Sequence, residues 1–121
     1  MNLWLAAAAS VAFATFLIHA VIGGREIARP LLEARDLGRI PQLTTYYCWH
    51  MVTILLLGMS VSLAWAARFA NVPLVVLMAA LAFAFTVLSL GLVVAYRVRP
   101  WYLPQWSLFA AIALLAGLGL A

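Results

Sequence analysis

The stretch VPLVVLMAALAFAFTVLSLGLVVAY, residues 72–96, contains no charged side chain. A bilayer with a hydrocarbon core of about 30 Å is crossed by roughly 17–25 helical residues. Backbone N–H and C=O groups find no water inside the hydrocarbon, so they must pair within the segment itself, and a helix does this. The stretch therefore predicts a transmembrane helix.

The rest of the chain has the same character. Its 121 residues are 69% hydrophobic and 8% charged, and further uncharged runs lie at about 3–24, 46–67 and 104–121. The first run lacks the basic start of a signal peptide, so we interpret it as a span. The alternation of a membrane barrel is absent. We predict an all-α integral membrane protein, with residues 1–121 forming a single four-transmembrane-helix bundle.

The basic residues predict the orientation of this bundle. All seven are arginines, and only Arg68 lies in the second connection. The first and third connections carry the other six: Arg25, Arg29, Arg35, Arg39, Arg97 and Arg99. Cytoplasmic loops are enriched in basic residues, so we expect both of these connections in the cytoplasm and both termini outside. The all-arginine set indicates a bacterial inner membrane, and no polar domain offers a basic surface to a nucleic acid.

The first connection contains a possible short helix at about 30–38. Pro30 suits the first helical position and Gly38 suits the end. The apolar residues between them, such as Leu31 and Leu37, can share one side, which is typical of an amphipathic helix lying in the membrane interface. The alternative is a solvated connector without regular structure.

Two histidines stand out on the polar sides of the first two spans. Steps of three and four place residues on one face of a helix. These faces contain Ala8, Ala12, Thr15, His19, Gly23 and Glu26 on the first span, and Tyr46, His50, Thr53, Leu57, Ser60 and Ala64 on the second. His19 lies five residues before Gly24 and His50 five after Thr45, so both should lie roughly 7 Å below the cytoplasmic headgroups.

The histidine pair admits a structural and a functional interpretation. Neutral imidazoles could fasten the helices by bonding to each other, to Thr15 or Thr53, or to a backbone carbonyl. Ionisable residues at membrane depth, however, mark functional sites by default. Our leading interpretation is a non-enzymatic accessory or binding subunit in which His19 and His50 form a polar site near the cytoplasmic face.

Cofactor binding is the alternative for the same pair. Two facing imidazoles could ligate haem b, with the propionates paired to Arg25, Arg29, Arg97 and Arg99, although closely packed helices would have to splay to admit a porphyrin. A quinone or proton-relay site would use His50, Tyr46 and Glu26 as exchanging groups. A metal ion would need His19 and His50 together with Glu26 or Cys48. Cys48 projects roughly 200° away from His50 around the helix and more simply fills space.

The expected partners follow from the charge and the size of the bundle. The arginines are suited to anionic lipid headgroups on the cytoplasmic side. Four short helices bury little surface, so we expect a homo-oligomer or a larger membrane-protein partner. An oligomeric channel or transporter is a further class, but the outer half of the first span offers no polar residue beyond Ser10. No phosphate loop, catalytic triad or HExxH motif indicates an enzyme.

Overall fold

The computed structural model describes residues 1–121, and its regular structure is entirely helical. The elements are α1 (Leu3–Leu17), the π-helix η1 (Ile18–Ala28), α2 (Arg29–Glu33), α3 (Arg39–Phe69), α4 (Val72–Ala95), the short 3₁₀ helix η2 (Pro100–Tyr102) and α5 (Gln105–Leu120). The first three elements run on without a break, so the chain begins with one helix of 31 residues, Leu3–Glu33.

Three helices are long and apolar enough to cross a membrane. They are Leu3–Glu33, Arg39–Phe69 and Val72–Ala95, which agrees with the predicted membrane protein. The fourth, α5, is a shorter apolar helix of 16 residues. At 1.5 Å per residue, the 31 residues of α3 extend over roughly 46 Å. This helix is therefore longer than the hydrocarbon core of a bilayer.

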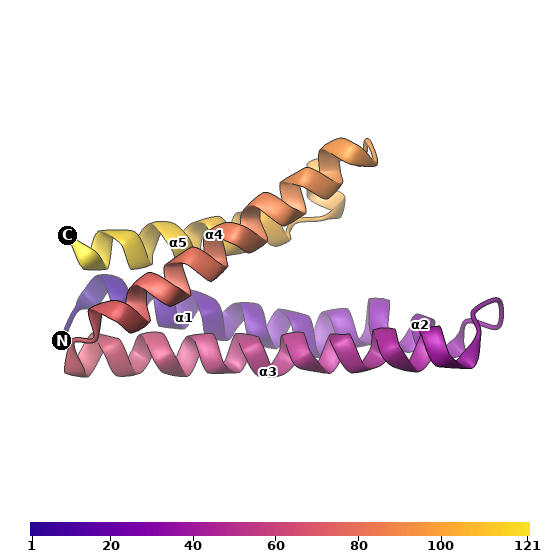
Figure 1. Ribbon diagram of the computed structural model, residues 1–121, viewed down its shortest axis with the longest axis horizontal. Coiled ribbons are helices and arrows are strands. Elements are labelled where there is room, and N and C mark those ends of the chain that lie inside the picture. The colour runs from indigo at the N-terminus through magenta and orange to yellow at the C-terminus, as the bar shows by residue number, and fades with distance from the viewer.

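The molecule has two regions that differ in how many helices pack together. Both termini and the turn between α3 and α4 lie at the same end, where α1 packs against α3 and α5, and α4 against α5 (Figure 1). Toward the other end α4 diverges from α3 (Figure 1). We call the part where all four helices pack the four-helix end. The projecting hairpin of residues 18–54, formed by η1, α2 and the first half of α3, is called the arm.

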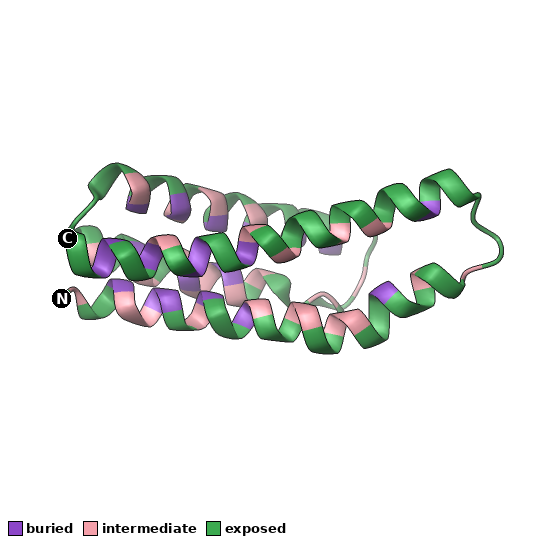
Figure 2. Ribbon diagram, turned by 90° about the horizontal axis from the view of Figure 1, so that it is seen from below, coloured by how far each residue is buried: buried purple, intermediate pink, exposed green.

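The buried core is confined to the four-helix end. Fifteen buried apolar residues form one cluster there, and the buried faces gather between the helices in that half of the molecule (Figure 2). The face of α1 in this core is made of small residues, Ala8, Ala9 and Ala12. Small side chains permit close approach of the helix backbones. Ser60 Oγ on α3 donates to the carbonyl of Ala9 at 3.0 Å. In the arm, only Ala28 and Gln42 are buried.

Asn2 joins three helices at the four-helix end. Its Oδ1 accepts from the backbone N–H groups of Trp4 and Leu5 and so caps α1, as side-chain oxygens do at helix starts. Its Nδ2 donates to Gly119 O of α5 at 2.8 Å, and its own N–H donates to Ala67 O of α3 at 2.8 Å. The side chain and the backbone N–H of this one residue thereby link the ends of three helices.

The separate interfacial helix predicted at about 30–38 is wrong. Residues 29–33 continue the first helix, and Ala34 is extended, with φ −66° and ψ 117°. The reason is the side chain of Gln42, whose Nε2 lies 2.9 Å from the carbonyl oxygens of Leu31 and Leu32 and 3.1 Å from that of Ala34. A helix leaves its last carbonyls without partners from a following turn. Leu31 O also accepts from Ala34 N–H, and Gln42 serves all three, so α3 caps its neighbour.

Two predicted spans are too short for the observed helices. The second helix begins at Arg39 rather than at residue 46, and the first continues to Glu33 rather than ending near residue 24. The hydrophobic runs mark only the parts that suit hydrocarbon. The polar continuations are helical because the two antiparallel helices of the arm support each other through Gln42 and Trp49.

The π-helix changes which residues share a face. Its wider turn shifts the phase relative to an α-helix. Glu26, which a regular α-helix would place with His19, is exposed and forms no hydrogen bond or ion pair, whereas Ala28 is buried. The inward face of η1 therefore presents Ala20, Gly24 and Ala28, at steps of four. The predicted face of the first span holds as far as Thr15, His19 and Gly23, which faces the same Trp49 as His19, and is lost at Glu26.

Candidate functional site

His19 is held against α3 by stacking and by hydrogen bonds. Its ring lies 3.9 Å from the Trp49 ring, centroid to centroid, with an interplanar angle of 18°. Its Nε2 is 3.2 Å from the Trp49 carbonyl oxygen and 3.1 Å from Thr53 Oγ1. A carbonyl oxygen can only accept, so Nε2 carries the proton and donates. Thr53 and a backbone carbonyl are two of the partners considered for a structural histidine, and His19 contacts both. Its Nδ1 forms no hydrogen bond.

Gly23 makes room for this stacked pair. A Cβ atom at Gly23 would lie 2.6 Å from Trp49 Cη2 and 3.0 Å from Cζ2. At the neighbouring Gly24, a Cβ atom would meet nothing within 4 Å. The two glycines of the Gly-Gly pair thus differ: the first permits the close approach of the indole, and the second faces open space.

His50 points to a different neighbour. It is exposed, and its ring meets the Tyr46 ring edge-on, at 4.5 Å and 85°. No hydrogen bond joins His50 to His19. The His19 ring is covered by Trp49, and its Nε2 is already used. The structure does not bring two imidazoles face to face across a gap, so its geometry does not favour axial ligation of haem by this pair.

Between the two helices of the arm lies a cavity of about 280 Å³, which we call the arm groove. The first helix contributes Ala20, Gly24, Ala28, Arg29 and Leu32, and α3 contributes Tyr46, Trp49 and His50. One wall is therefore made of small and apolar residues, and the other groups are a guanidinium, an imidazole and a phenol. This combination can receive an anionic group, because the cation supplies charge while the small wall allows close approach.

Arg29 has binding capacity left in the structure. Its Nε donates to Glu33 Oε1 at 3.0 Å, and both side chains are largely exposed, at 76% and 66%. Exposed ion pairs of this kind contribute little. The two terminal nitrogens of Arg29 have no protein partner, so the guanidinium can still offer parallel N–H groups to an anion.

The other predicted site residues lie elsewhere. Arg25 and Glu26 are exposed and unpaired, while Arg97 and Arg99 lie in the connection from α4 to α5, away from the arm (Figure 1). Arg99 is placed over the Trp101 ring at 5.9 Å. The four arginines considered for one set of propionates are thus divided between two elements. No three His, Cys, Asp or Glu side chains gather as metal ligands, and Cys48 is exposed.

Two residues that organise this region were missed in the sequence. Trp49 resembles a headgroup anchor, and Gln42 a loop residue, because neither carries a motif. The signal for Trp49 is the Gly-Gly pair on the facing helix, since a missing Cβ often marks a bulky neighbour. No signal in the sequence pointed to the capping role of Gln42. Compared with family models, curated proteins and solved structures, the chain shows no match.

Proposed function

We propose that this protein is a non-enzymatic binding subunit of a bacterial inner membrane, and that the arm groove holds the anionic group of a membrane ligand. The observation that carries the proposal is the joint lining of one cavity by Arg29, His50 and Tyr46. A phosphate or carboxylate fits this set: Arg29 offers parallel N–H donors, and the imidazole and phenol offer one donor each.

The depth of the groove supports a ligand at headgroup level. His50 lies 19 residues from Phe69, the last residue of α3, which corresponds to roughly 28 Å along the helix. This is close to the thickness of the hydrocarbon core. With the four-helix end in the outer leaflet, the groove opens among the headgroups of the inner leaflet. The arginine-rich connections then face the cytoplasm, as expected for basic loops.

The shape of the arm supports an accessory role. Apart from the part of α3 near Phe85, its two helices have no α4 or α5 beside them (Figure 1). They expose large apolar side chains such as Tyr47, Met51 and Ile54, at 65%, 52% and 72%. In the proposed orientation, these side chains meet lipid near the surface or another membrane protein. Assembly with a second copy or a larger partner would cover them.

The test compares two arginines of one helix. Wild type, Arg29→Gln and Arg25→Gln are reconstituted in nanodiscs of phosphatidylcholine with added phosphatidic acid, and bound phosphatidic acid is counted by native mass spectrometry. Arg25 is the matched control, because it is exposed and outside the groove. Loss of a charge-assisted bond of about 1.5–3 kcal/mol should weaken retention roughly ten- to a hundredfold in Arg29→Gln.

Two outcomes would contradict the proposal. Equal lipid retention in Arg29→Gln and Arg25→Gln would show that binding depends on the total number of arginines and not on the groove. Displacement of the lipid by millimolar inorganic phosphate would show that the site recognises a free anion rather than a headgroup. His50→Gln should reproduce part of the loss, since the imidazole lines the same cavity.

A further inference from the structure

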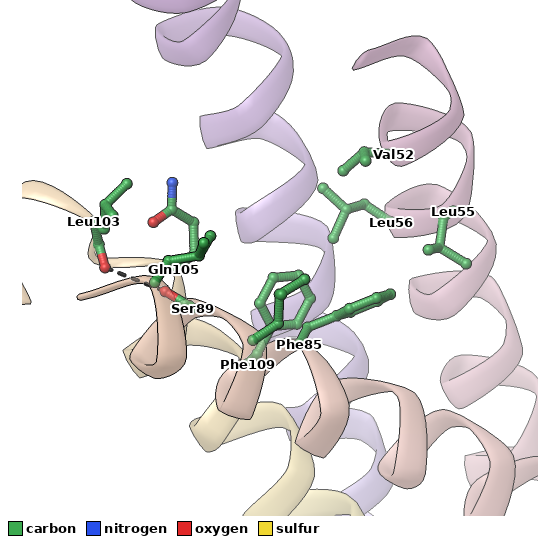
Figure 3. A pocket seen from close by; sticks show the side chains of 10 residues that line it. Val52, Leu55, Leu56, Phe85, Ser89, Leu103, Gln105 and Phe109 are labelled. Atoms are coloured by element: carbon green, nitrogen blue, oxygen red, sulfur yellow. Dashed lines mark hydrogen bonds between the residues drawn. The ribbon is translucent and has the colours of Figure 1, made fainter. Parts of the chain in front are cut away.

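A second cavity lies where α4 and α5 diverge from α3, on a different face of α3 from the arm groove. Its volume is about 270 Å³. Side chains from three helices point into it (Figure 3), with Val52, Leu55 and Leu56 on α3, Phe85 on α4 and Phe109 on α5. We call this cavity the wedge. An adjoining cavity shares Val52, Leu55 and Phe85 with it and extends the apolar surface along α3.

The wedge is apolar except at one end. Its polar residues are Ser89 and Gln105. Ser89 Oγ already donates to Leu103 O, at 3.4 Å, whereas the Gln105 amide forms no hydrogen bond. Gln105 begins α5 directly after the connection that carries Arg97 and Arg99. The interior of the wedge is therefore apolar, and its two polar residues lie on either side of the connection that carries Arg97 and Arg99.

The lining of the wedge favours a hydrocarbon chain. Eight of its ten lining residues are hydrophobic. Water is a poor occupant, because a buried water needs two to four polar partners. A lipid chain from the surrounding bilayer needs no polar partner there.

We infer that the wedge holds one acyl chain of an anionic phospholipid, whose phosphate lies against Arg97 and Arg99. Neither arginine is engaged in an ion pair: the structure's one salt bridge joins Arg29 to Glu33. The free amide of Gln105 lies between chain and phosphate, where it can donate to an ester carbonyl. This site is independent of the arm groove and does not rest on the proposed function.

The experiment introduces a larger side chain at an exposed residue that lines the wedge, so that this side chain occupies the cavity. Val52 is 40% exposed, so a larger side chain can enter the cavity without disturbing the buried core. Val52→Trp is compared with Val61→Trp, which lies on the same helix at 60% exposure and lines none of the cavities described above. Proteins in nanodiscs of dioleoylphosphatidylcholine with dioleoylphosphatidic acid are analysed by native mass spectrometry and by thermal unfolding in detergent.

Val52→Trp should lose about one retained phosphatidic acid per protein, as should Arg97→Gln/Arg99→Gln, while Val61→Trp should keep it. Retention equal to wild type in Val52→Trp would overturn the inference. So would equal retention of phosphatidylcholine and phosphatidic acid in wild type, or conversion of an oligomer to a monomer by Val52→Trp at unchanged lipid content. If Val52→Trp fails to fold, Leu88→Trp fills the wedge from α4, where Leu88 is 60% exposed.

Discussion

The four-helix end and the arm are built from similarly apolar helices but held together in different ways. At the four-helix end, a cluster of fifteen buried residues lies between the helices, with three alanines of α1 at the contact. The arm buries two residues and relies on the Gln42 cap and the His19–Trp49 stack. Apolar composition provides no drive for association within lipid, so close packing stabilises one region and directional contacts stabilise the other.

This difference explains where a binding site can form. Regions with few buried contacts open at lower free energy than packed cores. The arm can therefore adapt to a ligand, while the four-helix end maintains the fold. The two regions should also respond differently to substitution, and the following four predictions test this from the largest effect to the smallest.

Ala12→Leu should cause the largest decrease in the free energy of unfolding, because Ala12 is fully buried among the helices of the four-helix end. Added methylenes in a packed core cost about 1–3 kcal/mol, and a site without free volume belongs at the upper end. Free energies of unfolding from SDS titration in mixed micelles measure this. Ala14→Leu is the control, since Ala14 on the same helix is exposed. Equal stability of the two variants would mean that the helices do not pack closely there.

Gln42→Ala should destabilise the arm alone. Three carbonyls lose the amide that lies within 3.1 Å of each. Leu31 O keeps the Ala34 N–H as a donor, and the other two cost about 2 kcal/mol if they stay unpaired. Hydrogen exchange should become faster over residues 29–43 and remain unchanged in α4 and α5. Thr44→Ala, an exposed residue without a hydrogen bond, should leave exchange unaltered. Faster exchange throughout the chain would show that the two regions are one cooperative unit.

Gly23→Ala should disturb the stacked pair, and Gly24→Ala should not. The new Cβ would lie 2.6 Å from Trp49 at the first position and contact nothing at the second. A Trp ring pushed off its rotamer costs about 0.5–1.5 kcal/mol. NMR of labelled histidine should show the His19 ring protons losing the upfield shift caused by the indole. An unchanged shift in Gly23→Ala would contradict the stacked geometry.

Ser60→Ala should give the smallest loss, about 0.6 kcal/mol, which is typical of interhelical hydrogen bonds within membranes. It removes the bond from Ser60 Oγ to the Ala9 carbonyl and keeps the small side chain that close packing requires. Ser62→Ala is the control, because Ser62 on the same helix makes no such bond. If Ser60→Ala lowered the free energy of unfolding more than Gln42→Ala, directional contacts rather than close packing would stabilise the four-helix end.

Part of the site could be predicted because it depends on local spacing. Steps of three and four in the first span correctly placed Ala8, Ala12 and Thr15 inward, and they brought His19 to Thr53. The same steps failed for Glu26, because the π-helix from Ile18 to Ala28 changes the phase. They also failed for Leu57, which is 41% exposed, and for Ala64, which is exposed on the same predicted face of the second span.

The helical class, the apolar segments and the six arginines in two connections follow from local composition and from the requirement that backbone groups pair within a helix. The extent of the helices, the point where they diverge and the side chains that meet depend on tertiary contacts. Gln42 caps the end of a helix that begins at Leu3, Trp49 rather than His50 faces His19, and the wedge exists because α4 leaves α3 to follow α5. These are contacts between distant segments, and no local pattern specifies them.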